Sequence, residues 1–143
     1  MAVKKAKAVW KGTGKEGDGR LTSESGVLDN SAYSFKTRFG DEKGTNPEEL
    51  LAAAHAGCFS MALSLVLGQA GFVADSINTR AEVTMEPGMS PGPTVTGVTL
   101  VLNAKVPGID AAQFQQIAEG AKAGCVISRA LAVPVTLQAT LDV

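Results

Sequence analysis

Two cysteines, Cys58 and Cys125, are the residues of this chain whose type is best suited to carry out a reaction. Each directly follows an Ala-Gly pair, in the runs "HAGC" and "KAGC". Such small neighbours let another stretch of backbone, or a substrate, come close to the sulfur. If the helices that carry them pack together, the two sulfurs can meet and cycle between thiols and a disulfide. Two unrelated, inert buried thiols are the alternative on residue types alone.

A reactive cysteine must be a thiolate, and Cys58 needs help to become one. It lies about eleven residues after the start of a predicted helix, too deep for the helix dipole to act on it. Arg38 is the preferred cation, because its planar fork can hold a carboxylate with one edge and face a sulfur or a peroxide with the other. Glu48 and Glu49 are the candidate carboxylates to orient it. The other candidate cations are Lys36, Lys43 and Arg129. An unpaired surface arginine is the alternative reading of Arg38.

His55, three residues before Cys58, shares its helix face and raises two further possibilities. It can form a Cys-His nucleophile pair, or it can be a polar residue satisfied at the helix edge. No CxxC or HxxxH spacing is present, so we expect no metal site. The glycine-rich run "GTGKEGDG" lacks the GK[ST] ending of a phosphate-binding loop, and it predicts hairpin turns.

The composition predicts one soluble domain over residues 1–143. Lys and Arg number 13 against 14 Asp and Glu, which argues against a nucleic-acid partner. We expect no membrane-spanning segment, because no run of about 18 apolar residues is present. Two cysteines are too few for a disulfide-stabilised secreted domain, so the expected location is the reducing cytoplasm.

The elements that must position these residues begin with short strands. Residue alternation and turn signals predict strands over Lys4–Lys11, Gly19–Ser23 and Tyr33–Phe39, joined as an antiparallel meander. The pattern then changes to a helix. Asn46 is its predicted cap, Pro47 suits its first position, and Gly71 lies just past its end.

The apolar spacing along this helix predicts which face is buried. Apolar residues recur at steps of one, three or four, and Cys58 lies near the centre of their stripe. The stripe consists of Leu50, Leu51, Ala54, Cys58, Met61, Ala62 and Leu65. Glu48 and Glu49 complement the positive end of the helix dipole.

The C-terminal half predicts two strands, two helices and a last strand. The runs "INTRAEVTME" and "TVTGVTLVLNAKV" form a hairpin with "PGMSPGP" between them. A second helix is capped by Asp110 and stops at Gly124, "VISRAL" adds a short helical piece, and "VPVTLQATLDV" is a strand. Tight turns among the strands favour an α+β fold with antiparallel pairing.

Two long segments resemble one protein family. They are "VLDNSAYSFKTRFGDEKGTNPEELLAAAHAGCFSMALSLVLGQAGF" and "VPGIDAAQFQQIAEGAKAGCVIS". Both are similar to the OsmC branch of the OsmC/Ohr family of thiol peroxidases. The resemblance implies a cysteine-based peroxidase that reduces organic hydroperoxides, and hydrogen peroxide less well, in the oxidative and osmotic stress response. It also implies a two-layer α+β fold with antiparallel sheets around a long central helix, in an intertwined homodimer.

The resemblance also assigns roles to individual residues. It implies that Cys58 is the peroxidatic thiolate, Cys125 the resolving cysteine, Arg38 the stabilising cation and Glu48 its carboxylate partner. Each active site would lie at the subunit interface, with an external dithiol, such as a lipoylated protein, as reductant and no cofactor. Many relatives have Pro after the second cysteine, whereas this chain has Val126, which leaves the helix start there less firmly defined. Two alternative functions remain open for a relative with this fold. One is binding of a hydrophobic ligand without catalysis, and the other is redox sensing.

Overall fold

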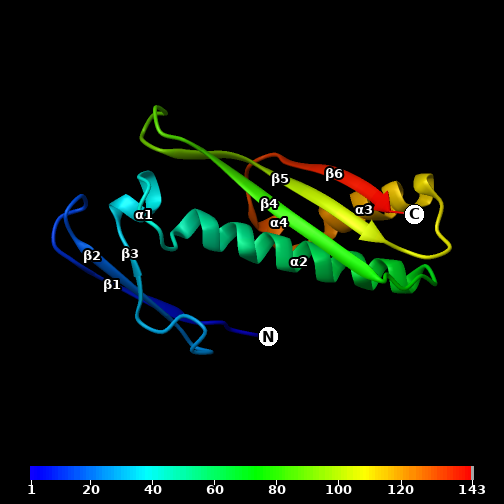
Figure 1. Cartoon of the computed structure of the whole chain (residues 1–143), viewed down its shortest axis with the longest axis horizontal. Helices are drawn as coiled ribbons and strands as arrows, with labels where there is room; N and C mark the ends of the chain where they lie inside the picture. The colour runs from blue at the N-terminus through cyan, green and yellow to red at the C-terminus, as the bar shows by residue number, and fades with distance from the viewer. Residues whose placement is uncertain (143) are drawn as a thin grey trace. The chain divides into compact units, whose positions relative to one another are not determined.

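The computed structural model describes residues 1–142 and contains strands and helices in mixed order (Figure 1). The elements are β1 (Ala6–Lys11), β2 (Asp18–Ser23), β3 (Ser31–Tyr33), α1 (Phe35–Phe39), α2 (Pro47–Gln69), β4 (Ser76–Glu86), β5 (Thr94–Lys105), α3 (Ala111–Gly124), α4 (Val126–Ala130) and β6 (Val135–Asp142). The α+β prediction is therefore confirmed. The chain divides into two compact units, Met1–Leu50 and Leu51–Val143.

The first unit is built on a three-stranded antiparallel sheet in the order β1-β2-β3, which confirms the predicted meander. Trp10 lies opposite Gly19, and its ring centroid is 5.5 Å from that of Tyr33. A Cβ atom on Gly19 would collide with both rings, so this position requires glycine. The glycine-rich run joins β1 to β2 as a hairpin turn, in which Gly12 has a φ of 95°.

The predicted strand over Tyr33–Phe39 is wrong, because the chain turns into helix α1 after Ser34. The Ser34 hydroxyl accepts a hydrogen bond from the Thr37 N–H at 3.3 Å, and the Thr37 hydroxyl accepts one from the Ser34 N–H at 2.9 Å. This reciprocal capping box gives partners to two backbone N–H groups and stabilises a single helical turn. Arg38 consequently lies on a helix.

Helix α2 begins and ends as predicted. The Asn46 side-chain oxygen accepts a hydrogen bond from the Glu49 N–H at 2.9 Å, and Gly71 follows the last turn with a φ of 88°. Among the described residues, α2 alone is long and apolar enough to cross a membrane. Length and composition are weak evidence for a membrane-spanning helix, because the core helix of a soluble protein meets the same criteria.

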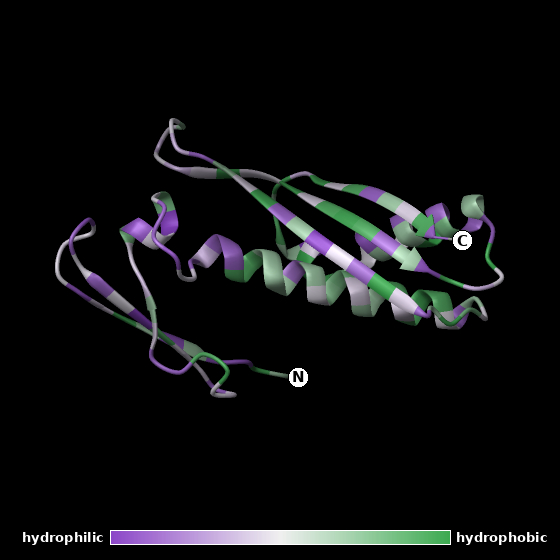
Figure 2. Cartoon of the chain, in the orientation of Figure 1, coloured by the Kyte–Doolittle hydropathy of each residue, from purple (hydrophilic) through white to green (hydrophobic). Residues whose placement is uncertain are grey.

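The face of α2 that is buried within the chain differs from the predicted stripe. The buried residues recur at four-residue steps: His55, Phe59, Leu63 and Leu67. Met61 and Leu65 of the predicted stripe are 69% and 63% exposed. Beyond its charged first turn, α2 is mostly apolar along its length (Figure 2). Because apolar residues occur on more than one face, spacing alone does not determine which face packs on the sheet.

The second unit contains the sheet β4-β5-β6. Strands β4 and β5 pair antiparallel as predicted, but β5 and β6 are parallel, and the antiparallel prediction is wrong for this pair. Parallel neighbours need a crossover connection, and α3 and α4 supply it between these two strands (Figure 1). Asp110 caps α3 as predicted, accepting from the Gln113 N–H at 2.8 Å.

One hydrophobic core lies between this sheet and its helices. Strand β5 buries alternate residues, from Val98 to Ala104, on a single face of the sheet. The same core contains residues of α2 and of α3: Phe59, Leu63, Leu67, Phe114, Ala118 and Ala121. Cys125 belongs to it and is 1% exposed. Every fully buried hydrophobic side chain that the structure describes lies in this second unit.

Candidate active site

The two cysteines come together in the second unit. Cys58 lies on α2 and Cys125 at the junction of α3 and α4, and their sulfurs share a hydrogen bond of 3.0 Å. Both are free thiols. Cys58 is only partly buried, whereas Cys125 is almost inaccessible. The pair can therefore form a disulfide, and Cys58 is the sulfur that a molecule from outside reaches first.

Cys125 lies directly before the first residue of α4. That helix begins at Val126, so a proline is not needed to start it. Burial opposes ionisation of Cys125, but the Cys58 thiol and the backbone and hydroxyl of Ser128, together with the backbone of Ile127, outweigh it and lower its pKa. The local structure therefore makes Cys125 ionise more readily than an ordinary cysteine.

Cys58 has the opposite tendency. Burial raises the pKa of its thiol, and its hydrogen bond with Cys125 raises it further. Two thiols that share a hydrogen bond lose their protons in two steps that belong to the pair, one easily and one with difficulty. A negative charge located on Cys58 thus requires a positive group in addition to this pair.

Arg38 and Glu48 form a close ion pair in the first unit. The Arg38 Nη2 lies 2.6 Å from Glu48 Oε1, and Arg38 Nε lies 3.0 Å from Oε2. The hydrogen bonds that Arg38 donates to Glu48 raise the pKa of Arg38. Burial opposes ionisation of Glu48, but its hydrogen bonds with Arg38 lower its pKa overall. Both groups are charged at neutral pH, and the carboxylate fixes the orientation of the guanidinium.

Aromatic side chains surround a hollow beside this ion pair. Its lining includes Arg38 and the rings of Trp10, Tyr33, Phe35 and Phe39. The guanidinium carbon of Arg38 lies 5.0 Å from the centroid of the Phe39 ring, a cation-π distance. An apolar group with a polar end fits such a surface.

His55 is a site residue whose environment sequence reasoning missed. It is fully buried rather than satisfied at a helix edge, and its Nε2 lies 2.7 Å from the Ser128 Oγ. Burial lowers its pKa below the usual 6.5. The sequence contains no signal for this contact, because 73 positions separate the two residues.

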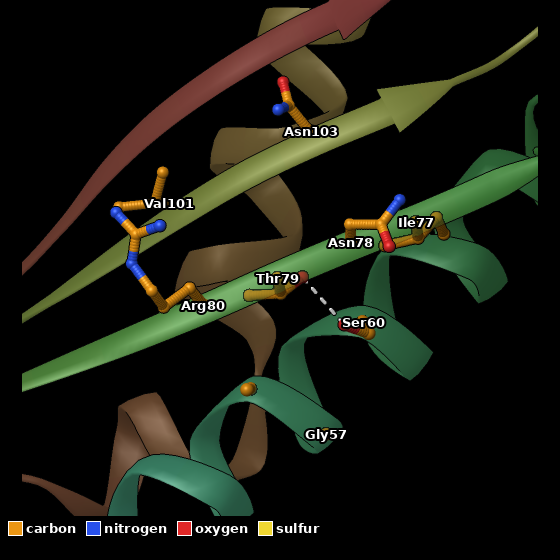
Figure 3. A pocket seen from close by; sticks show the side chains of 9 residues that line it. Gly57, Ser60, Ile77, Asn78, Thr79, Arg80, Val101 and Asn103 are labelled. Atoms are coloured by element: carbon orange, nitrogen blue, oxygen red, sulfur yellow. Dashed lines mark hydrogen bonds between the residues drawn. The ribbon is translucent and has the colours of Figure 1, made fainter.

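A second hollow lies along β4, and Gly57, next to Cys58, contributes to it (Figure 3). Ser60 points from α2 toward Thr79 of β4, and their hydroxyl oxygens are 2.7 Å apart. A Cβ atom on Gly57 would meet nothing within 4 Å. Gly57 therefore leaves open space beside Cys58, as the Ala-Gly pair before this cysteine predicts.

Arg38 and Glu48 belong to the first unit and the cysteines to the second. The Glu49 backbone N–H is used in capping α2, and the side chains of Lys36, Lys43 and Arg129 are exposed. Within residues 1–142, no three His, Cys, Asp or Glu side chains gather into a metal-binding cluster.

The α+β fold and the paired cysteines define a class of protein. The profile of the family described as "OsmC-like protein" matches residues 40–139. The chain is 52% identical to the peroxiredoxin OsmC of Escherichia coli K12, over 94% of this chain and 93% of the relative. It is 35% identical to the organic hydroperoxide resistance protein OhrB of Bacillus subtilis, over 78% and 80% of the two chains. The chain belongs to the OsmC/Ohr family, in its OsmC branch, which confirms the resemblance of its sequence.

Solved structures agree with this membership. The crystal structure of Bacillus subtilis OhrB aligns with a TM-score of 0.71 at 29% identity, covering 96% of this chain and 98% of that one. An OsmC-like protein of unknown function from Vibrio cholerae aligns with a TM-score of 0.78 at 17% identity, covering 98% and 100%. The second likeness concerns the fold alone.

Proposed function

We propose that this protein is a cysteine-based peroxidase that reduces organic hydroperoxides, and hydrogen peroxide less well, with Cys58 and Cys125 as its redox pair. The observation that carries the proposal is the 3.0 Å separation of their sulfurs in a member of the OsmC/Ohr family. The two cysteines differ in their access to solvent, and this difference assigns their roles. Cys58 is the peroxidatic cysteine because a substrate can reach it, and Cys125 is the resolving cysteine because it is buried directly behind it.

The reaction proceeds in three steps. The Cys58 thiolate attacks one peroxide oxygen, the O–O bond breaks, and the alkoxide takes a proton to leave as an alcohol. Cys58 is now a sulfenic acid. The Cys125 thiolate attacks its sulfur, a disulfide forms, and hydroxide leaves as water after protonation. An external dithiol then reduces the disulfide and becomes a disulfide itself, which restores both thiols.

Arg38 supplies the positive charge that the cysteine pair lacks. The immediate environment raises the pKa of Cys58, so a cation must favour its thiolate and polarise the peroxide. Arg38, held by Glu48, is charged and oriented for this role. The aromatic hollow beside Arg38 suits the alkyl part of an organic hydroperoxide better than it suits hydrogen peroxide.

The working form is a homodimer with its active sites at the subunit interface. Within the described residues, the first unit contributes no fully buried hydrophobic side chain, and a three-stranded sheet needs a buried hydrophobic face or a packed helix to be stable on its own. Met61 and Leu65 of α2 are also largely exposed. A second copy of the chain that covers these surfaces accounts for both observations, and Arg38 can then serve Cys58 of the other protomer.

The redox chemistry is compatible with a cytoplasmic location and with a dithiol as reductant. The chain acts as a single domain, in the cytoplasm, where dithiols are kept reduced. A lipoylated protein fits the role of external reductant because it presents a dithiol. The thiols themselves carry the two electrons, so the cycle requires no cofactor.

One measurement tests the central claim. Reduced protein is treated with one equivalent of cumene hydroperoxide, and its peptides are analysed by mass spectrometry without reduction. We expect a Cys58–Cys125 crosslink in the treated sample and none in the untreated control. Absence of the crosslink, with both thiols intact, contradicts the proposal.

Binding of a hydrophobic ligand without catalysis is a second candidate, and the aromatic hollow beside Arg38 favours it. A pure binding protein keeps both free thiols when it is exposed briefly to a hydroperoxide at neutral pH. A redox sensor loses them but shows no sustained turnover with any dithiol. The peroxidase loses them and recovers them repeatedly.

A further inference from the structure

The side-chain amide of Asn46 makes two hydrogen bonds, one as acceptor and one as donor. Its Oδ1 accepts from the Glu49 N–H at 2.9 Å, which caps α2, and its Nδ2 donates to the Thr37 carbonyl at 3.1 Å. A backbone N–H only donates and a carbonyl only accepts, so a single orientation of the amide satisfies both contacts. Asn46 therefore joins the start of α2 to the last turn of α1.

The second of these hydrogen bonds is not needed to cap a helix. Serine and aspartate cap helices about as well as asparagine, because each supplies an oxygen that accepts from the first turn. Asp110, which caps α3 by accepting from the Gln113 N–H at 2.8 Å, has no amide group to donate. Asparagine accepts and donates through two separate atoms. The Nδ2–H of Asn46 thus makes a contact that capping alone does not require.

The Thr37 carbonyl is well suited to receive this donor. Thr37 lies in the last turn of α1, where carbonyl groups have no N–H partner four residues further on within the helix. The connection between α1 and α2 also comes close to it, because a Cβ atom on Gly44 would lie 2.9 Å from the Thr37 Cγ2. The capping box with Ser34 fixes the opposite end of this helical turn. Asn46 therefore holds the end of α1 that the capping box does not.

Arg38 and Glu48 lie beside the two ends of this connection. Arg38 directly follows Thr37, and Glu48 follows Asn46 with only Pro47 between them. Proline fixes its own φ, which limits the freedom of that link. The ion pair at 2.6 Å and the amide hydrogen bond at 3.1 Å consequently close one short ring. Without the amide bond the ion pair would hold this ring alone, and a pair whose arginine is 39% exposed contributes little by itself.

We propose that Asn46 is a positioning residue for Arg38. Its amide holds the end of α1 against the start of α2, and this contact sets the direction in which the Arg38 guanidinium points. The inference rests on the proposed function, in which Arg38 favours the Cys58 thiolate and polarises the peroxide. Asn46 takes no part in bond breaking, and it acts through Arg38.

Hydrogen exchange of the Arg38 Nε–H, followed by NMR, reports the geometry of the ion pair without any peroxide. The Nε atom lies 3.1 and 3.0 Å from the two Glu48 oxygens, so an intact pair slows exchange of its proton with water. The signal is assigned by its absence in Arg38→Lys. We expect Asn46→Ser to speed this exchange about fivefold, the effect of losing one neutral hydrogen bond.

The variants separate the amide contact from the helix cap. Asn46→Ser keeps a neutral cap oxygen and removes the amide donor, so the protein should remain folded. Asn46→Thr does the same and should give the same faster exchange. Asp110→Ser is the matched control: it makes an equivalent cap replacement on α3, and Arg38 should exchange as in the wild type. Circular dichroism and urea denaturation check the fold of each variant.

Stopped-flow oxidation of Cys58 by cumene hydroperoxide tests whether Asn46 acts through Arg38. Asn46→Ser should slow the reaction about fivefold. In an Arg38→Ala background the same substitution should have no further effect, because the group that Asn46 positions is already absent. A merely structural role for Asn46 would instead slow the reaction by the same factor in both backgrounds.

Exchange of the Arg38 Nε–H at the wild-type rate in folded Asn46→Ser protein overturns the inference, even if the wild type is a peroxidase. Equal slowing of Cys58 oxidation in the wild-type and Arg38→Ala backgrounds also overturns it. A wild type that consumes no hydroperoxide, together with faster Arg38 exchange in Asn46→Ser, would instead remove the proposed function and leave the positioning contact intact.

Discussion

The sulfurs of Cys58 and Cys125 lie 3.0 Å apart although 67 positions separate the two residues along the chain. Helix α2 carries the first, and the break between α3 and α4 carries the second. Their packing in one core brings two free thiols within reach of a disulfide bond, which makes the proposed role of each sulfur testable.

Serine substitutions should separate the two cysteines. Cys58→Ser is expected to abolish consumption of cumene hydroperoxide, because it removes the nucleophile. Cys125→Ser should permit a single turnover and leave Cys58 as a sulfenic acid that further peroxide oxidises to the sulfinic acid. Mass spectrometry distinguishes these products by their added oxygen atoms. Multiple turnovers by Cys125→Ser would remove that residue from the cycle.

Arg38→Ala should slow oxidation of Cys58 by about 100-fold, because loss of one oriented charge at a reacting centre typically costs that much. It should also raise the pKa of Cys58. Stopped-flow kinetics and thiolate titration measure the two effects. Arg20→Ala is the matched control: Arg20 pairs with Asp18 at 3.0 Å on β2, and its loss should leave the rate unchanged. Equal rates for wild type and Arg38→Ala would exclude Arg38 from the site.

Stability should fall as pH drops below 6.5. Burial lowers the pKa of His55, so the folded state holds this ring neutral while the unfolded state protonates it at about its usual 6.5. Below 6.5 the unfolded state therefore binds more protons, and the free energy of unfolding decreases as pH falls toward the lowered pKa of the folded state. Between pH 7.5 and 5.5 the loss has an upper limit of about 1.4 kcal/mol, which applies to a ring that stays neutral in the folded state throughout.

Urea denaturation at the two pH values measures this loss. His55 is the one histidine in the sequence, so His55→Gln should remove most of the dependence in this window. Glu48 contributes at lower pH, because its pKa is lowered from 4.5 and its stabilisation is lost only as it becomes protonated. An equal slope in wild type and His55→Gln would contradict the burial argument.

Two leucines on α2 should respond differently to substitution. Leu63 is fully buried in the core, and Leu63→Ala should destabilise the protein by about 2–5 kcal/mol through the cavity it leaves. Leu65 is 63% exposed in the chain, and Leu65→Glu should instead dissociate the proposed dimer. Light scattering reports the mass, and chemical denaturation reports the stability. A Leu65→Glu protein that remains dimeric would place the interface elsewhere.

Local patterns determined much of the fold. The caps Asn46 and Asp110 and the glycine at 71 act on backbone groups a few residues away, so the sequence predicts the bounds of α2 and the start of α3 well. The error at Tyr33–Phe39 also had a local cause, because a capping box between Ser34 and Thr37 outweighed the strand-like pattern.

The sequence by itself determined the α+β class, the long helix, the two candidate thiols and the family. Tertiary structure decided which face of α2 is buried, because that helix is apolar on more than one side and only packing against β5 and α3 selects among them. It also decided that β6 runs parallel to β5 and that His55 meets Ser128 across 73 positions. Pairing direction and buried polar contacts depend on atoms far apart in the chain, and residue spacing carries no information about them.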